Sequence, residues 1–317
     1  MGVVLTLLLV FGSQVVLADD VVAEEEEFVI GWSNASIGNP WRIEMVERAT
    51  RRLEEMYPQV TMYVTHAQDS VSRQISDAED LLARDIDLLM LSPASMDGLN
   101  VIVDRAKNQG IPCVVVQRET SNRDFTALVW NDDKQLGALS GLEAARIMGH
   151  EGRVGIIEGF AGAPSTMNRN VGIKHSLELY PDIEVVAQLP GDYQEARARS
   201  VMEDILLREP DIDAMIIHSG TMARGALSAI RAEGRAGDIK IITIGSENHV
   251  LKEIARGNMH STVMETVGVG ADGIDKAMKV LQGEDFNKLF PTLSPIVTPL
   301  NVEEWVEWDW DDDTWVW

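Results

Sequence analysis

Polar and aromatic side chains follow several apolar segments that the sequence predicts to be strands. They supply amides, guanidinium groups, a hydroxyl, a carboxylate and one indole. Because ligands of open parallel sheets bind at the carboxyl ends of the strands, we expect these side chains to face one site. The set is Asn39, Trp41, Arg42, Gln117, Arg118, Arg169, Ser219 and Glu247.

This combination of side chains suits a sugar. Each sugar hydroxyl both donates and accepts a hydrogen bond, so amides, carboxylates and guanidinium groups pair with adjacent hydroxyls. The C–H face of the ring packs on an aromatic side chain. We therefore expect Trp41 to stack on the ring and the three arginines to bind hydroxyls. Any single one of these residues could instead be a solvated loop residue or a helix cap, but the agreement of five strand ends favours a shared site.

The sequence lacks the common motifs of catalytic sites, which argues against an enzyme. The stretch Gly159–Gly162 is too short for a dinucleotide fingerprint, and no Lys followed by Ser or Thr completes a phosphate loop. No Gly-x-Ser-x-Gly motif occurs, and the six histidines lack metal-ligand spacing. The sequence predicts no catalytic residues, no cofactor and no metal site, and a secreted hydrolase is the least favoured class.

Strands and helices alternate regularly along the chain. Continuous apolar runs of four or five residues suit strands that are covered on both faces, and the spacing predicts parallel sheets with right-handed crossovers. The pattern runs through two cycles of similar length, which predicts two similar α/β lobes. The expected strands are Phe28–Gly31, Val60–Val64, Leu88–Leu91, Cys113–Val116, Leu128–Trp130, Val154–Ile157, Val185–Ala187, Ala214–Ile217 and Ile239–Ile244; the expected helices include Trp41–Met56, Ser72–Arg84, Asn168–Leu179, Gln194–Arg208, Met222–Glu233 and Gly268–Leu281.

Composition limits the class of partner. The chain has 317 residues, enough for two domains with a core each, and a formal charge of −24. That charge argues against nucleic acid and anionic membranes as partners. It is compatible with a cationic ligand, but an acidic, soluble surface explains it more simply. The single cysteine, Cys113, lies in an apolar run, so we expect a core residue and no disulfide within the chain.

Both ends of the chain differ from the body. Residues 1–18 resemble a signal peptide, with an apolar run and a Val16-Leu17-Ala18 cleavage site, although no basic residue follows Met1. A membrane anchor is the alternative. An acidic spacer, 19–27, follows. The tail, 301–317, interleaves five tryptophans with acidic residues, and we expect it to dock on the body; a partner-binding or ligand-gating tail is the alternative.

Several ordered segments make the chain resemble the periplasmic sugar-binding proteins of ABC transporters, in the ribose- and galactose-binding group. The resemblance runs from about Phe28 to Pro299. Asn39-Pro40-Trp41-Arg42 is similar to the first-strand loop of the family, and its Trp-Arg pair is closest to the galactofuranose-binding branch. The other segments are Gln117-Arg118, Asp133–Gly137, Asn168-Arg169 and Gly191-Asp192-Tyr193.

The chain departs from the family pattern at four ligand positions. Gln117 stands where the family has Asp, Ser219 where it has Asn, and Glu247 where it has a sugar-binding Asp. Glu265 replaces a customary Gln, and the resemblance adds it to the expected ligand-binding set. These changes leave the fold intact but obscure the identity of the sugar.

The resemblance implies two doubly wound parallel-sheet lobes of the type I periplasmic binding protein class, joined by a hinge of three crossovers. We expect one lobe at 27–131 plus 266–292 and the other at 132–265 plus 293–300. A monosaccharide would be captured between the lobes by hinge closure and delivered, in the periplasm, by a monomeric protein to an ABC permease. The alternative is a sugar or autoinducer sensor that docks to a membrane signalling receptor. A cytoplasmic repressor is disfavoured by the signal peptide.

Overall fold

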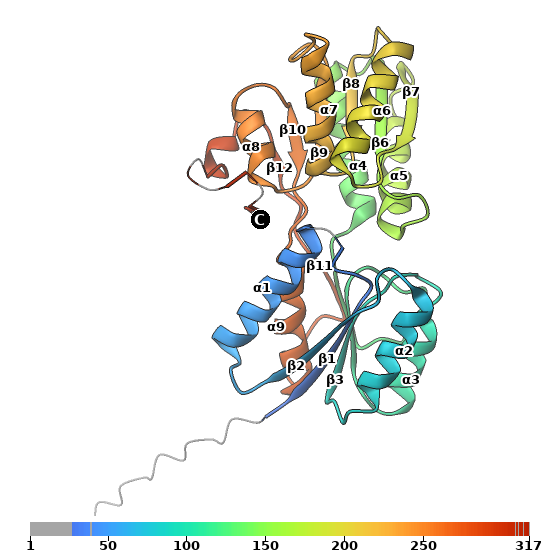
Figure 1. The fold of residues 1–317 in the computed structure, drawn as a ribbon, viewed down its shortest axis with the longest axis vertical. Helices are drawn as coiled ribbons and strands as arrows, with labels where there is room; N and C mark the ends of the chain where they lie inside the picture. Colours follow the sequence, from blue (N-terminus) through green and yellow to red (C-terminus); the bar gives the residue numbers. More distant parts are fainter. Residues whose placement is uncertain (1–26, 39, 308, 310, 313, 317) are drawn as a thin grey trace, which may run out of the picture.

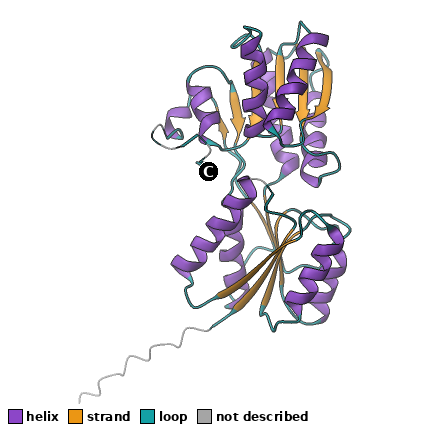
Figure 2. Cartoon of the chain, viewed as in Figure 1, coloured by secondary structure: helices purple, strands orange, loops and turns teal. Residues whose placement is uncertain are grey.

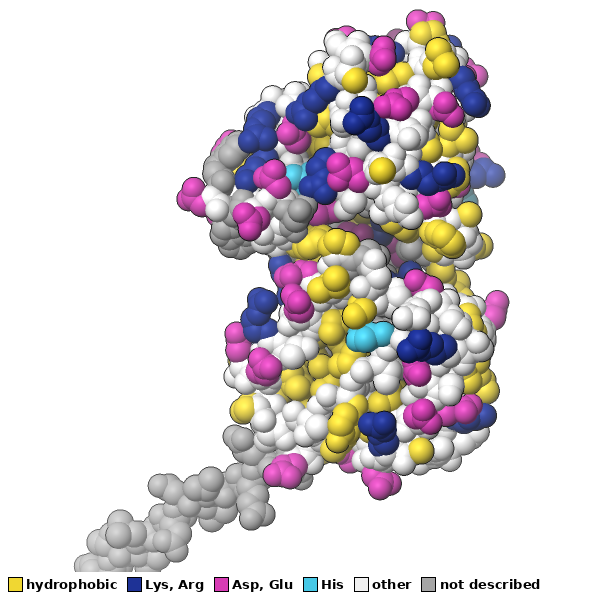
Figure 3. Space-filling view, in the orientation of Figure 1, with side chains coloured by type: hydrophobic (Ala, Val, Ile, Leu, Met, Phe, Trp, Pro, Cys, Tyr) yellow, Lys and Arg dark blue, Asp and Glu magenta, His cyan; other side chains and the backbone are white. Residues whose placement is uncertain are grey.

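The computed structural model describes residues 27–316 except 39, 308, 310 and 313. The predicted signal peptide and nearly all of the acidic spacer lie outside the described residues. Two α/β lobes follow one another along the long axis of the molecule (Figure 1). Figure 3 shows that they meet at a narrow waist, where hydrophobic side chains reach the surface on this face. The two-lobed fold class expected from the sequence is confirmed.

The first lobe is a six-stranded sheet in the order β11-β5-β4-β3-β1-β2, with helices on both faces (Figure 2). Neighbouring strands are parallel throughout this sheet. Its elements are β1 (Val29–Asn34), α1 (Pro40–Met56), β2 (Thr61–His66), α2 (Val71–Leu82), β3 (Leu88–Ser92), α3 (Asn100–Asn108), β4 (Cys113–Gln117), β5 (Ala127–Trp130), α9 (Val269–Leu281) and β11 (Leu289–Pro291).

The second lobe repeats this plan with the order β12-β10-β9-β8-β6-β7. The short β12 pairs antiparallel with β10, which departs from the all-parallel sheet that the sequence predicts. The elements α3, α4, α8 and β10 were not among the segments we expected. The second lobe comprises α4 (Asp133–Met148), β6 (Gly152–Glu158), α5 (Pro164–Leu177), β7 (Ile183–Pro190), α6 (Glu195–Arg208), β8 (Ala214–Ile217), α7 (Gly220–Ala232), β9 (Lys240–Ile244), α8 (Asn248–Ala255), β10 (Ser261–Val263), β12 (Ile296–Val297) and the 3-10 turn η1 (Val302–Glu304).

Strand periodicity explains the two cores of the first lobe. In β3, Leu88 and Met90 join the cluster beneath α1 and α9, whereas Leu89 and Leu91 join the cluster beneath α2 and α3. Successive side chains of a strand point to opposite faces, so a continuous apolar run fills both. Cys113 lies in the second of these clusters, where burial raises the pKa of its thiol to about 12.

Three connections pass between the lobes: β5 to α4, β10 to α9 and β11 to β12. The buried side chain of Asn131 links all three. Its Nδ2 donates to the carbonyl oxygen of Thr266 at 3.0 Å, and its Oδ1 accepts from the hydroxyl of Thr292. Because each of the three residues belongs to a different connection, one amide keeps the crossovers together.

The helices α4 and α5 pack closely because glycines face the opposite backbone. A Cβ on Gly137 would lie 2.1 Å from the carbonyl oxygen of Arg169, and one on Gly172 would lie 2.1 Å from that of Lys134. Backbone atoms cannot rotate away as a side chain can, so only glycine fits. This packing places the start of α4 beside the Arg169 position of α5.

A methyl group at the α4–α5 contact is expected to be costly. The variant Gly172→Ala should lose about 1–3 kcal/mol of unfolding free energy through overpacking, measured by urea denaturation. Leu142→Ala, at an exposed position of α4, is the control and should stay within about 0.5 kcal/mol of the parent. Equal stability of G172A and the parent protein would contradict the close backbone contact.

Candidate binding site

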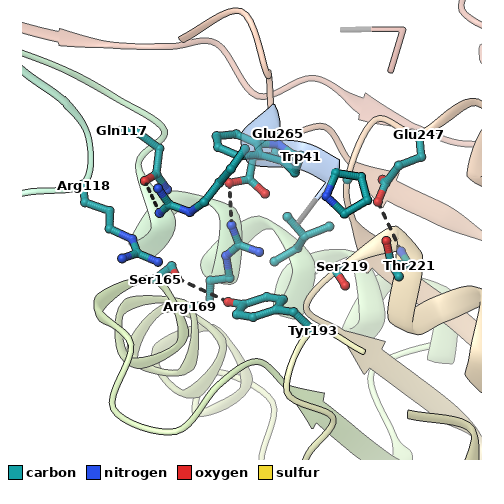
Figure 4. Close-up of a pocket in the computed structure, with 14 residues that line it drawn as sticks. Trp41, Gln117, Arg118, Ser165, Arg169, Tyr193, Ser219, Thr221, Glu247 and Glu265 are labelled. Atoms are coloured by element: carbon teal, nitrogen blue, oxygen red, sulfur yellow. Dashed lines mark hydrogen bonds and ion pairs between the residues drawn. The ribbon is translucent and has the colours of Figure 1, made fainter. Parts of the chain in front are cut away.

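A cavity between the lobes is lined by eight of the nine predicted site residues (Figure 4). The ninth, Asn39, lies outside the described residues. The first lobe contributes the start of α1 and the end of β4; the second contributes α5 and the starts of α7 and α8; Glu265 comes from the β10–α9 connection. The predicted residues in the lining are Trp41, Arg42, Gln117, Arg118, Arg169, Ser219, Glu247 and Glu265; the lining residues outside the predicted set are Pro40, Ser165, Tyr193, Thr221, Ile244 and Gly245.

Arg169 is the centre of a buried ionic network. Its guanidinium is 2.8 Å from Asp133 and 2.8 Å from Glu265, and it also donates to the carbonyl oxygen of His218 at 2.5 Å. The whole residue is only 2% exposed. Burial opposes its charge, but Glu265 and Asp133 outweigh burial and raise the pKa of Arg169. All three guanidinium nitrogens of Arg169 bind protein groups. That Arg169 also binds a ligand hydroxyl stays a prediction.

Asp133 is the carboxyl group of this network whose charged form burial disfavours. It begins α4 and is 7% exposed. Burial raises the pKa of Asp133 to about 6, although Arg169 favours its charged form. The neighbouring Glu265 carboxylate adds to the rise by repulsion. The network therefore places two carboxylates on one arginine, where the second is harder to ionise than the first.

Two further arginines enter from the first lobe. Arg42 donates to Oε1 of Gln117 at 2.9 Å, and Arg118 lies next to Gln117 in sequence. Burial, followed by repulsion from Arg118, lowers the pKa of Arg42 to about 9; burial also lowers the pKa of Arg118. The Nε of Arg118 is buried without a hydrogen-bond partner among the described residues. A ligand acceptor at this point would satisfy a group that the protein leaves unsatisfied.

Gln117 adopts an unusual backbone conformation. Its φ is 71°, in the left-handed region that residues other than glycine rarely occupy. The turn follows β4 directly and brings both Gln117 and Arg118 to the cavity. Strain of this kind is concentrated at functional sites, which supports a functional role for the strand end.

Two aromatic rings face the cavity from opposite lobes. Trp41 lies in the first turn of α1, and Tyr193 follows β7 (Figure 4). The Tyr193 hydroxyl is hydrogen-bonded to Ser165 and Thr166. A Cβ on Gly159 would lie 2.0 Å from the tyrosine ring, so this glycine makes room for Tyr193. The sequence could have pointed to Tyr193, because Tyr193 belongs to the family segment Gly191-Asp192-Tyr193 and Gly159 lies just after a predicted strand.

Ser219 and Glu247 meet the first turn of α7. The hydroxyl of Ser219 accepts from the backbone N–H of Met222 at 3.2 Å, and Oε1 of Glu247 accepts from that of Thr221 at 3.2 Å. Glycines at 220 and 245 leave room for the carboxylate. Glu265 is paired with Arg169, whereas Glu247 faces a helix N-terminus, which also favours negative charge.

The cavity is small. Its volume is about 110 Å³, which suits a single sugar ring or a small polyol better than an oligosaccharide. No cluster of three or more His, Cys, Asp or Glu side chains in the described part of the chain is arranged to bind a metal ion. Within the described ranges, no helix has the length and apolar character needed to cross a bilayer.

Comparison with known proteins agrees with this architecture. A family model described as a periplasmic binding protein domain matches residues 30–285. The chain belongs to this family. It is 27% identical over 280 residues to the ribose import binding protein of Bacillus subtilis (strain 168), covering 88% of each chain.

Solved structures show the same fold. A solute-binding protein of an ABC transporter from Bacillus halodurans C-125, with bound myo-inositol, superposes with a TM-score of 0.82 at 26% identity, covering 89% of this chain and 98% of that one. A galactofuranose-binding protein superposes with a TM-score of 0.79 at 22% identity, covering 87% and 96%. The family resemblance inferred from the sequence is confirmed.

The raised pKa of Asp133 predicts a pH dependence. A carboxyl group whose pKa rises on folding, here from 3.8 to about 6, contributes stability that is complete below the unfolded value and lost as pH rises through the folded value. Asp133→Asn cannot ionise and leaves Glu265 as partner of Arg169. Between pH 4 and 6, the unfolding free energy of D133N should therefore rise relative to the parent.

Chemical denaturation at several pH values measures this difference. Glu178→Gln, at an exposed position, is the control, and its unfolding free energy should change with pH as that of the parent protein does. A fall in the unfolding free energy of D133N relative to the parent between pH 4 and 6 would contradict the raised pKa of Asp133. It would show that the attraction of Arg169 outweighs burial.

Proposed function

We propose that this protein captures a monosaccharide, or a cyclic polyol of similar size, in the cavity between its lobes and delivers it to an ABC permease. The observation that carries the proposal is the lining of the cavity: two aromatic rings, three arginines and two carboxylates, contributed by both lobes and the connection between them. Hinge closure would bury the ligand and present a closed surface to the permease. Export through the predicted signal peptide would place the protein in the periplasm, as a monomer.

The chemistry of the lining supports a hydroxyl-rich ligand. Trp41 and Tyr193 offer flat apolar surfaces to the two faces of a ring. Gln117 and Arg118 supply donors and acceptors at its edge, and Glu247 and Glu265 accept from hydroxyls. Members of the family that bind ribose and myo-inositol, together with the size of the cavity, support the same ligand class.

The lining supports binding rather than catalysis. The carboxylate of Glu265 is ion-paired with Arg169, and that of Glu247 accepts from the start of α7. The buried histidine His218 has a pKa lowered well below its usual value by burial and by Arg169, and its Nδ1 accepts from the backbone of Gly159. Protein contacts hold each of these groups in place, and none of them stands in the arrangement of a nucleophile with its base.

A sensor that hands its bound form to a membrane receptor would use the same cavity. The sequence offered its tryptophan-rich tail as the docking element. In the structure Trp315 is only 6% exposed and packs on its own chain. The Trp315 ring is therefore not available as a docking surface.

A thermal-shift screen against pentoses, hexoses, inositols and furanosyl compounds tests the proposal. A ligand far above its dissociation constant should stabilise the protein by about 3–4 kcal/mol, so one or a few related compounds should raise the melting temperature clearly. The absence of any shift across the whole panel would contradict the proposal.

Removing the Trp41 ring should weaken the binding of the compound found in that screen. Trp41→Ala should cost about 1–3 kcal/mol of binding free energy, measured by titration calorimetry. Tyr63→Ala, which removes an exposed ring from β2, is the matched control and should bind as the parent does. Unchanged affinity in W41A would exclude the stacking role.

A further inference from the structure

The C-terminal segment, here the described residues from Glu307 to Val316, caps the helix that borders the cavity. Helix α8 begins without a side-chain cap. Its first two backbone N–H groups, of Asn248 and His249, donate instead to the carbonyl oxygens of Thr314 at 2.7 Å and Asp312 at 2.9 Å. Because the first N–H groups of a helix have no partner within the helix, this segment completes α8.

The same segment runs beside the binding residues. Trp315 forms an antiparallel bridge with Glu247, and the N–H of Val316 donates to the carbonyl oxygen of Ser246 at 2.9 Å. An ion pair between Lys252 and Asp312, at 2.9 Å, fastens it further to α8. The segment therefore belongs to the second lobe and touches the turn that carries Glu247.

One contact reaches the other lobe. Nη2 of Arg48 donates to the carbonyl oxygen of Trp315 at 2.6 Å, while Nε of the same guanidinium is 2.7 Å from Glu44. Arg48 lies on α1, the helix whose first turn carries Trp41 and Arg42. In Figure 1 the last described residues, coloured dark red, lie between α8 of the upper lobe and α1 of the lower one.

We propose that the C-terminal segment is a clasp between the lobes: through the Arg48–Trp315 hydrogen bond it favours the arrangement seen here, in which both lobes line one cavity and which we call closed. The bond joins residues that lie on opposite sides of the hinge, so separation of the lobes breaks it. An interaction made in one of two states shifts the population toward that state. The clasp acts on helices α1 and α8, both of which contribute to the cavity, without occupying the cavity itself.

The clasp requires a hinge between the lobes but no particular ligand. Its test therefore uses the protein without ligand, and a failure of the sugar-binding proposal would not affect it. Spin labels at D80C and K174C, exposed positions on α2 and α5, report the separation of the lobes by double electron–electron resonance. Cys113 is buried and the pKa of its thiol is raised to about 12, so it does not compete for the labels.

Arg48→Ala should move the distance distribution toward longer separations, with the closed-to-open ratio falling about three- to tenfold, as expected for one hydrogen bond. Arg51→Ala, which removes an exposed arginine from the same helix, is the matched control and should leave the distribution unchanged. Equal distributions for R48A and the parent protein would overturn the clasp.

A second comparison separates the clasp from any other effect of Arg48. In a chain shortened after Val306, R48A should cause no further change, because the acceptor is already absent. An undiminished effect of R48A in the shortened chain would overturn the proposal. If the shortened chain does not fold, as circular dichroism would show, the comparison of R48A with R51A in the full chain decides alone.

Discussion

The buried positive charge of Arg169 is the constraint on which the rest of the site depends. An arginine that is 2% exposed requires partners, because an unpaired buried charge costs several kcal/mol. Its carboxylate partners come from two of the three connections between the lobes: Asp133 follows the first connection directly, and Glu265 lies within the second. The arginine of the second lobe thus fixes the polypeptide where it passes between the lobes. Its own place depends on the glycine contacts between α4 and α5.

The rest of the cavity follows from this arrangement. Helices α1, α7 and α8 begin at the carboxyl ends of parallel strands and point their first turns at the space between the lobes. Their N-termini favour negative charge, which explains why Glu247 can remain buried beside the start of α7. The ionic network on one side and the helix starts on the other leave a small polar cavity between two aromatic rings. Such a cavity suits an uncharged, hydroxyl-rich molecule.

The sequence predicted the two lobes and most of the cavity lining, because a single rule places both. Continuous apolar runs indicate covered parallel strands, and the residues after each strand gather at one edge. The predicted set left out Ser165 and Thr221, which lie in the first turns of α5 and α7 as Trp41 does in α1. The rule also cannot show how the lining residues pair with each other. The partners of Arg169 lie 36 and 96 positions away along the chain, a separation that no local pattern reveals. The antiparallel β12 is likewise set by the direction of the last connection rather than by its own two residues.

Hydrogen exchange followed by mass spectrometry tests the central claim, that one small ligand is held by both lobes, most directly. Exchange would be compared with and without the compound that stabilises the protein most. We predict slower exchange after ligand addition in three segments, around Gln117 in the first lobe and around Thr221 and Glu247 in the second, together with the connection at Glu265. Protection confined to one lobe, or located away from these segments, would contradict capture between the lobes.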